Sequence, residues 1–344
     1  MPLLEVTDLQ VAFSTPDGVL NAVRGLSFSV DAGKTLGIVG ESGSGKSVAT
    51  QTIMGLTRGA RISGEALFEG QDLLAMNSHQ LQRVRGSQIG MIFQDPLSSL
   101  HPYYRVGWQI VEMIRAHDRS MSKDQARTRA AELLRLVGIP RPDQRIDDYP
   151  HQFSGGMRQR AMIAMAVALN PKLVIADEPT TALDVTVQAQ VLQVLKRLQE
   201  EFGTAIIMIT HDLGVIADVA DDVVVMYAGK AMEKADRNTI FYRHHNPYTE
   251  GLLLSLPAYG EERERLHPIA GQPPSLITLP EGCPFRPRCP YAFDKCVEEP
   301  PLQEISGHAD HSSACWLPTD MRKRDKARRD TLGRDATVVG TGAE

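Results

Sequence analysis

Residues 40–47 of this 344-residue chain read Gly40-Glu41-Ser42-Gly43-Ser44-Gly45-Lys46-Ser47. This stretch fits the pattern G-x-x-x-x-G-K-[ST] at every fixed position. The apolar residues 36–39 before it predict a short buried strand, and the residues from about 45 onward predict a helix. In this strand–loop–helix context, a glycine-rich backbone wraps around phosphate groups while the N–H groups at the start of the helix face their negative charge.

Each residue type in the loop suits a nucleotide. Glycines allow close backbone approach, Lys46 is long enough to reach the β- and γ-phosphates of ATP, and the Ser47 hydroxyl is a ligand for Mg²⁺. The predicted nucleotide site comprises Gly40, Ser42, Gly43, Ser44, Gly45, Lys46, Ser47 and Val48. The alternative, a chance glycine-rich turn, is disfavoured by the strand and helix signals on either side.

A second polar group follows another buried strand. Residues 173–176 are apolar, and Asp177 and Glu178 come directly after them. In open α/β folds, ligands bind where parallel strands end, so we expect Asp177 to hold Mg²⁺, directly or through water, and Glu178 to polarise an attacking water molecule. Taken alone, two acids after a strand are usually only a polar strand end; the loop at 40–47 favours the functional interpretation.

The rest of the chain alternates strand and helix patterns, which predicts a mostly parallel sheet covered on both faces. Strands are expected at 3–13, 22–30, 89–93, 173–176, 205–209 and 223–227, and helices at 123–137, 157–169 and 187–202. Residues from about 95 to 158 have helical composition and are interpreted as a helical insertion. The predicted class is an α/β P-loop NTPase core with an antiparallel β subdomain.

Composition excludes several classes of protein. Hydrophobic residues make up 42% and charged residues 23%, and the net charge of −5 gives no sign of a nucleic-acid partner. The longest apolar run, residues 161–169, is about half the length of a membrane span. Residues 1–10 show no secretory pattern, so we expect a cytoplasmic protein whose membrane role would come through a partner.

All four cysteines fall near the C-terminal end, at Cys283, Cys289, Cys296 and Cys315. In a reducing compartment such a cluster more often holds a metal than forms disulfides, and four thiolates suit either Zn²⁺ or an iron–sulfur cluster. Proline density also rises after residue 236. We therefore expect a main domain at 1–235, a small cysteine-rich extension at 236–320 and a disordered tail at 321–344.

A further set of motifs resembles the ABC ATPase family over roughly residues 3–235. Ser154-Gly155-Gly156-Met157-Arg158-Gln159-Arg160 resembles the ABC signature, and Gln94, Asp184 and His211 follow the order and spacing of the family. The commonest signature has Leu and Gln where this chain has Phe153 and Met157, but the Ser-Gly-Gly core is intact. This combination is far more specific than a phosphate loop alone.

The resemblance implies a role for each of these residues. Ser154, Gly155 and Gly156 would contact the γ-phosphate of ATP held by an opposite subunit, so that each site is shared within a head-to-tail pair. Gln94 would contact Mg²⁺ or the attacking water, and His211 the γ-phosphate. Asp184 would bridge the two subunits. Phe13 is expected to stack on adenine, although it also fits a core strand residue.

Three shorter segments resemble the peptide-permease branch of the family: residues 94–100, residues 246–249 and the sequence around Cys283 and Cys289. That resemblance implies a 4Fe-4S cluster held by Cys283, Cys289, Cys296 and Cys315, with Zn²⁺ or unligated thiols as the alternatives. A structural role is expected for the cluster, because the region is too short to build its own core.

The resemblance implies an ATP-hydrolysing subunit of a peptide importer at the cytoplasmic face of the membrane. Its expected partners are a second, distinct ATPase subunit, two membrane permeases and an external solute-binding protein, with no nucleic acid. Nickel or another small solute is an alternative cargo. A non-hydrolysing regulatory subunit is disfavoured by Glu178 and His211, and a soluble ABC ATPase acting on DNA or ribosomes by the lack of a second cassette or long coiled coil.

Overall fold

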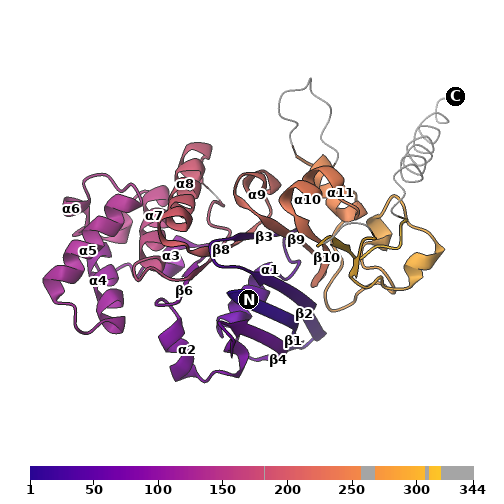
Figure 1. Cartoon of the computed structure of the whole chain (residues 1–344), viewed down its shortest axis with the longest axis horizontal. Helices are drawn as coiled ribbons and strands as arrows, with labels where there is room; N and C mark the ends of the chain where they lie inside the picture. The colour runs from indigo at the N-terminus through magenta and orange to yellow at the C-terminus, as the bar shows by residue number, and fades with distance from the viewer. Residues whose placement is uncertain (182, 257–267, 307–309, 319–344) are drawn as a thin grey trace.

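The computed structural model describes residues 1–181, 183–256, 268–306 and 310–318. Two sheets organise the fold (Figure 1): an eight-stranded sheet in the order β11-β12-β10-β9-β3-β8-β7-β6 and a four-stranded sheet in the order β2-β1-β4-β5. Helices α8 to α11 lie on one side of the larger sheet, while α1 and the smaller sheet lie on the other. The larger sheet is therefore covered on both faces, as the sequence predicts.

The strands are β1 (Leu4–Thr15), β2 (Gly18–Val30), β3 (Thr35–Val39), β4 (Ala60–Phe68), β5 (Gln71–Asp72), β6 (Ile89–Ile92), β7 (Leu173–Asp177), β8 (Ala205–Thr210), β9 (Asp222–Tyr227), β10 (Lys230–Asp236), β11 (Gln303–Glu304) and β12 (Ser312–Ser313). The α-helices are α1 (Lys46–Ile53), α2 (Ser78–Val84), α3 (Pro96–Ser99), α4 (Val106–His117), α5 (Lys123–Leu136), α6 (Pro142–Arg145), α7 (Gly155–Ala166), α8 (Val185–Phe202), α9 (Leu213–Val219), α10 (Arg237–Arg243) and α11 (Pro247–Leu254).

The centre of the larger sheet is parallel. β3 pairs with both β8 and β9, β7 pairs with β8, and β6 pairs with β7, all in parallel register. The smaller sheet is antiparallel, with β1 between β2 and β4. The predicted strands and helices are confirmed with ends shifted by a few residues, and the predicted P-loop α/β class is confirmed as well. The sequence patterns missed β4, β5, β10, β11 and β12.

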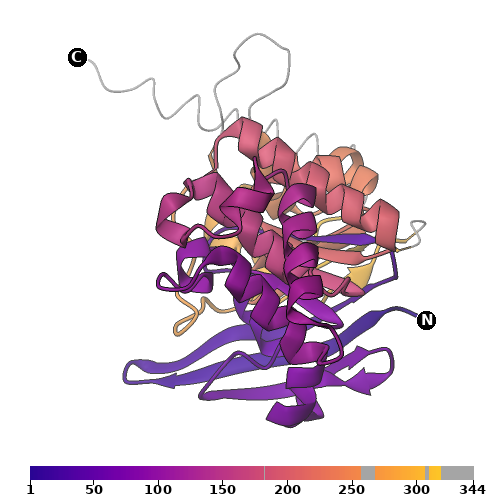
Figure 2. The ribbon, with the colours of Figure 1, turned by 90° about the vertical axis from the view of Figure 1, so that its left-hand side faces the viewer.

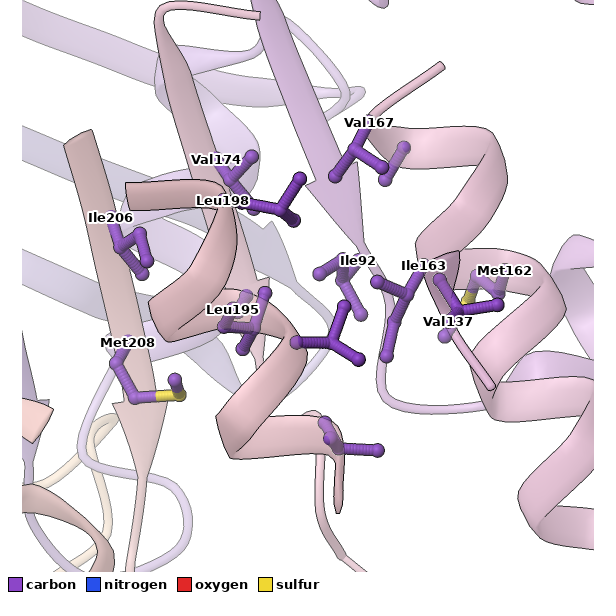
Figure 3. Packing of buried hydrophobic residues seen from close by; sticks show 14 of the residues in the cluster. Ile92, Val137, Met162, Ile163, Val167, Val174, Leu195, Leu198, Ile206 and Met208 are labelled. Carbon is purple, nitrogen blue, oxygen red and sulfur yellow. The ribbon is translucent and has the colours of Figure 1, made fainter. Parts of the chain in front are cut away.

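The main core lies between the parallel strands and the helices over them. Every residue of β7 and of β8 is buried, as expected for strands covered on both faces. Figure 3 shows Val174 and Ile206 of these strands facing Leu195 and Leu198 of α8. Full burial of each such side chain contributes roughly 1.5–3 kcal/mol, so this interface fixes α8 on the sheet.

Helices α4 to α6 form a cluster beside the sheet, within the stretch expected to be helical. Figure 2 shows this cluster facing the viewer, above the layer formed by the smaller sheet. α5 begins at a capping box, in which the Ser122 hydroxyl accepts from Gln125 N–H and the Gln125 side chain accepts from Ser122 N–H. Within the described ranges, none of the helices combines the length and the apolar character that a membrane span requires.

The C-terminal segment is built onto the larger sheet. β12 pairs antiparallel with β10, and β11 pairs with β12. The division of the chain at residues 235 and 320 stays a prediction, but these pairings show that the segment shares a sheet with the preceding part of the chain. The expected disorder of 321–344 falls outside the described residues.

A buried carboxylate joins this segment to β10. Glu233 has no exposed surface and accepts hydrogen bonds from His311 Nε2 at 2.8 Å, from Asn246 N–H at 3.1 Å and from His245 N–H. Because Asn246 also donates to the carbonyl oxygens of Met232 and Ala314, this buried polar cluster ties three segments together.

We expect Glu233→Ala to lower the free energy of unfolding by about 3 kcal/mol, because it leaves buried donors without an acceptor. Chemical denaturation measures this change. The matched control is Glu200→Ala, which removes a 64% exposed partner of Lys196 and should cost less than about 1 kcal/mol. Equal effects of the two substitutions would contradict a structural role for the buried cluster.

Candidate nucleotide-binding site

The loop at 40–47 lies between the end of β3 and the start of α1. Gly40 has φ 150° and Gly45 has φ 99°, and a Cβ added at either would lie 2.1 to 2.2 Å from a backbone oxygen. Only glycine fits these two positions. Gly45 supplies no side-chain cap to α1, so the N–H groups at the start of this helix are available to an anion.

Lys46 is folded over this loop. Its side-chain nitrogen donates to the carbonyl oxygens of Gly40 at 2.7 Å and Glu41 at 2.9 Å, and to Ser44 Oγ at 3.4 Å. Burial lowers the pKa of Lys46, an effect that the nearby carboxylates Glu178, Asp177 and Glu41 oppose. A desolvated ammonium held over a loop of N–H groups is well placed for a phosphate group.

Ser47 and Asp177 meet across the sheet edge. Ser47 Oγ donates to Asp177 Oδ1 at 2.7 Å, although 130 residues separate them. Burial raises the pKa of Asp177, and the hydrogen bond from Ser47 opposes that rise. A hydroxyl and a carboxylate side by side are the hard oxygen ligands that Mg²⁺ prefers, so this pair fits the predicted metal position.

Glu178 brings the predicted catalytic residues together. Its Oε2 accepts from Gln94 Nε2 at 2.9 Å and from Thr181 Oγ1 at 2.9 Å, while its Oε1 lies 3.5 Å from His211 Nδ1. Glu178 has φ 48°, a left-handed conformation that costs energy in a non-glycine residue. Sequence reasoning missed Thr181, because a threonine in a loop carries no signal of its own.

The signature segment begins a helix whose tip is exposed. Ser154 caps α7, and its Oγ accepts from Met157 N–H at 3.3 Å. Ser154 and Gly155 are exposed and Gly156 is half-buried. A Cβ added at Gly156 would lie 2.9 Å from Val187 of α8. Gln159 of α7 donates to Pro179 O at 2.7 Å, which links this helix to the residue after Glu178.

The remaining predicted residues have structural contacts of their own. Asp184 is exposed and caps α8, accepting from Val187 N–H at 3.0 Å. Phe13 and Val48 are half-buried and pack against the core cluster shared by the smaller sheet and α1. The expected contacts of Phe13 with adenine and of Asp184 with a second subunit stay predictions.

The four cysteines converge although they are spread over 33 residues of sequence. Cys283, Cys289, Cys296 and Cys315 all line one cavity, and none is in a disulfide. Burial raises the pKa of Cys289 to about 12 and also raises that of Cys283. In the part of the chain that the structure describes, no group of three His, Cys, Asp or Glu side chains is close enough to hold a metal ion as it stands.

The chain is similar to known proteins over most of its length. The profile of the ABC transporter family matches residues 23–181, and that of the oligopeptide/dipeptide transporter C-terminal region matches residues 232–296. The oligopeptide transport ATP-binding protein OppD of Escherichia coli strain K12 is 52% identical over 319 residues, covering 92% of this chain and 94% of OppD. The chain belongs to the ABC transporter ATPase family.

Other proteins similar to this ABC ATPase belong to the same family. OppD of Bacillus subtilis strain 168 is 52% identical and the dipeptide transport ATP-binding protein DppD of the same strain is 49% identical; the match covers 92% of this chain in each case, and 88% and 94% of the relative, respectively. The ATP-binding cassette MJ0796, solved as a dimer bound to ADP and Pi, superposes with a TM-score of 0.62 at 26% identity, covering 68% of this chain and 98% of MJ0796.

We expect Ser47→Ala to weaken the binding of MgATP by about tenfold while changing ATP binding in EDTA by less than about twofold, because the hydroxyl acts through the metal. Equilibrium titration with and without Mg²⁺ measures the difference. Ser47→Thr is the matched control, since it keeps the hydroxyl and the motif allows it. An equal loss in both buffers would assign Ser47 a purely structural role.

Proposed function

We propose that this ABC ATPase energises an importer of oligopeptides or dipeptides by hydrolysing ATP. The OppD and DppD relatives are about 50% identical over nearly their whole length, and residues 232–296 match the C-terminal region of such transporters. The observation that carries the hydrolytic part is the contact of Glu178 with both Gln94 and His211. This cluster lies at the same sheet edge as the phosphate loop.

In the proposed reaction, the N–H groups of the loop and Lys46 hold the ATP phosphates. Mg²⁺ supplies charge neutralisation, with Ser47 and Asp177 as its protein ligands. Glu178 accepts a proton from the attacking water, Gln94 helps to orient that water, and His211 donates to the γ-phosphate.

The exposed tip of α7 supports a shared site. An uncovered helix N-terminus with Ser154 and Gly155 at its surface suits an anion brought by a neighbour. We infer that a second ATPase subunit, a distinct paralogue, presents its own phosphate loop to this tip. Two permeases and an extracytoplasmic solute-binding protein complete the proposed system, which holds this chain at the cytoplasmic face of the membrane. In it, residues 1–235 act as the ATPase domain and 236–320 as its extension.

Glu178→Gln is expected to reduce ATP hydrolysis by at least about 100-fold, because the amide cannot accept the proton. The same variant should retain bound ATP and favour the closed pair. Phosphate release and the fraction of nucleotide-bound complex measure the two effects in the assembled transporter. Glu200→Gln serves as an exposed control. Hydrolysis at the wild-type rate by Glu178→Gln would contradict the assignment of Glu178 as the base.

We also infer that the four cysteines hold a 4Fe-4S cluster with a structural role. Four sulfur donors around one cavity fit such a cluster by number and type, and Zn²⁺ is the alternative for the same ligands. A cluster would join the turn at Cys283 and Cys289 to the segments that carry Cys296 and Cys315. The extension, which contributes few buried apolar side chains, would gain stability from that link.

Anaerobically purified full-length chain should contain about four iron atoms and matching sulfide per molecule, with a broad visible absorbance. Elemental analysis separates this result from one Zn²⁺ per chain or from no metal, either of which contradicts the iron–sulfur inference. Cys289→Ser should lower the iron content, whereas Ser306→Ala, in the same extension but away from the cysteines in sequence, should leave it unchanged.

A further inference from the structure

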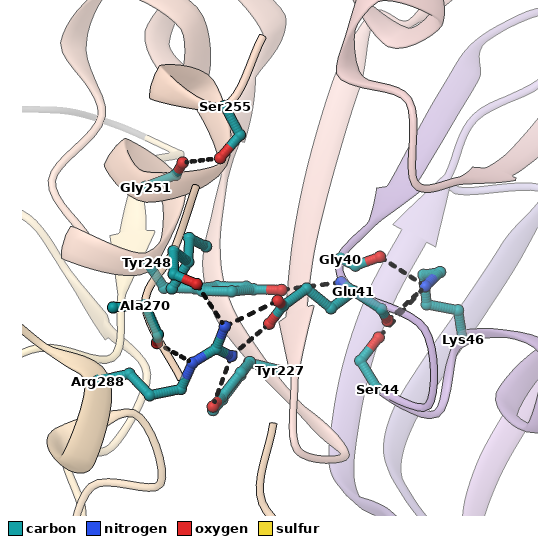
Figure 4. Close-up of polar contacts among 11 residues, drawn as sticks. Gly40, Glu41, Ser44, Lys46, Tyr227, Tyr248, Gly251, Ser255, Ala270 and Arg288 are labelled. Carbon is teal, nitrogen blue, oxygen red and sulfur yellow. Dashed lines mark hydrogen bonds and ion pairs between the residues drawn. The ribbon is translucent and has the colours of Figure 1, made fainter. Parts of the chain in front are cut away.

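The extension reaches the phosphate loop through one arginine. Arg288 donates to both carboxylate oxygens of Glu41, from Nη1 to Oε2 at 2.6 Å and from Nη2 to Oε1 at 2.9 Å (Figure 4). Its remaining donors bind Tyr227 Oη at 3.2 Å, Ala270 O at 3.0 Å and Ile269 O at 3.4 Å. The Arg288 side chain is 5% exposed, so this is a nearly buried, two-pronged ion pair.

Aromatic rings fix the position of that arginine. Phe285, Tyr227 and Tyr248 pack in a triangle with ring centroids 4.6 to 5.4 Å apart. The guanidinium lies 5.8 Å from the Tyr227 ring centre and 6.0 Å from that of Phe285. Arg288 ends a short 3-10 turn that is flanked by Phe285 and Cys289. Its placement is therefore a property of the folded extension.

Glu41 is held at three points. Its carboxylate binds Arg288, its N–H donates to Tyr248 Oη at 2.9 Å, and its carbonyl oxygen accepts from Lys46 at 2.9 Å. Figure 4 shows Glu41 between Arg288 and Tyr248 on one side and Lys46 on the other. Two of these three contacts come from residues beyond 236, so the extension sets the conformation of the second residue of the loop.

The ion pair between Arg288 and Glu41 affects the electrostatics of the phosphate loop. A carboxylate within a loop that receives a triphosphate repels it, and the repulsion is strong where water is partly excluded. Glu41 is such a carboxylate, with a side chain that is 26% exposed. Arg288 neutralises it and also turns both of its oxygens toward the extension.

We propose that Arg288 is a positioning residue for ATP binding, which acts by neutralising and orienting Glu41 of the phosphate loop. This inference rests on the proposed ATP site at residues 40–47. It assigns the extension a second role besides any metal that it holds: it completes the electrostatic environment of the nucleotide. Tyr248, in the segment 246–249 that resembles peptide-permease ATPases, supports the same loop residue.

Equilibrium titration of the full-length chain with Mg²⁺ and a non-cleavable ATP analogue tests the proposal. Arg288→Ala should raise the Kd by about tenfold at low salt and by less at high salt, because removing the arginine opens Glu41 to solvent, where salt screens its repulsion of the phosphates. The double variant Glu41→Gln/Arg288→Ala should bind within about twofold of Glu41→Gln alone, because no charge is left to neutralise. Arg288→Lys should recover part of the affinity, since it restores the charge but not the two-pronged contact.

Controls separate this inference from the proposed function. Arg135→Ala removes the same charge from an exposed ion pair in α5 and should bind as wild type does. If the wild-type chain binds the analogue no better than Lys46→Ala does, both the proposed ATP site and this inference are wrong. If wild type binds and Arg288→Ala binds equally well, only the inference is overturned. It is overturned also if the Arg288→Ala loss is independent of salt and persists in the Glu41→Gln background, because Arg288 would then support the fold alone.

Discussion

The parallel hydrogen-bond ladder that joins β3, β8, β7 and β6 determines where the functional residues of this protein lie. Because these strands run in one direction, their carboxyl ends meet at one edge of the sheet. In register, Val39 faces Thr210 and Asp177 faces Ile209. The residues that follow the strands, separated by long stretches of sequence, are thereby delivered to one place, and the loop at 40–47 closes over it.

Local patterns predicted much of this arrangement. The buried strands were visible as short apolar runs, and α5 and α8 as segments with helical spacing, because both signals arise from neighbours in sequence. The phosphate loop was predictable for the same reason, since its glycines, Lys46 and Ser47 act within eight consecutive positions. The meeting of Ser47 with Asp177 followed once a parallel sheet was assumed.

What the sequence could not supply depends on pairs of distant residues. Glu41 and Arg288 are 247 positions apart, and neither position stands out, because each is a charged residue in a polar segment. The burial of Glu233 could not be predicted either, because it depends on the pairing of β10 with β12. The strand β12 is only two residues long and has no recognisable sequence pattern. Such contacts are set by the packing of the whole chain rather than by local preference.

The pairing of β12 with β10 has a consequence for solubility. β10 leaves the parallel part of the sheet as an antiparallel strand, and without β12 its outward N–H and C=O groups would form an open edge. Open edges recruit strands from other molecules and promote aggregation. Through the pairs Glu233 with Ser313 and Lys234 with Ser312, the C-terminal segment covers the middle of this edge. Shortened forms of the chain that end before these residues would expose the edge of β10 and would be prone to aggregate, even if their catalytic centre were intact.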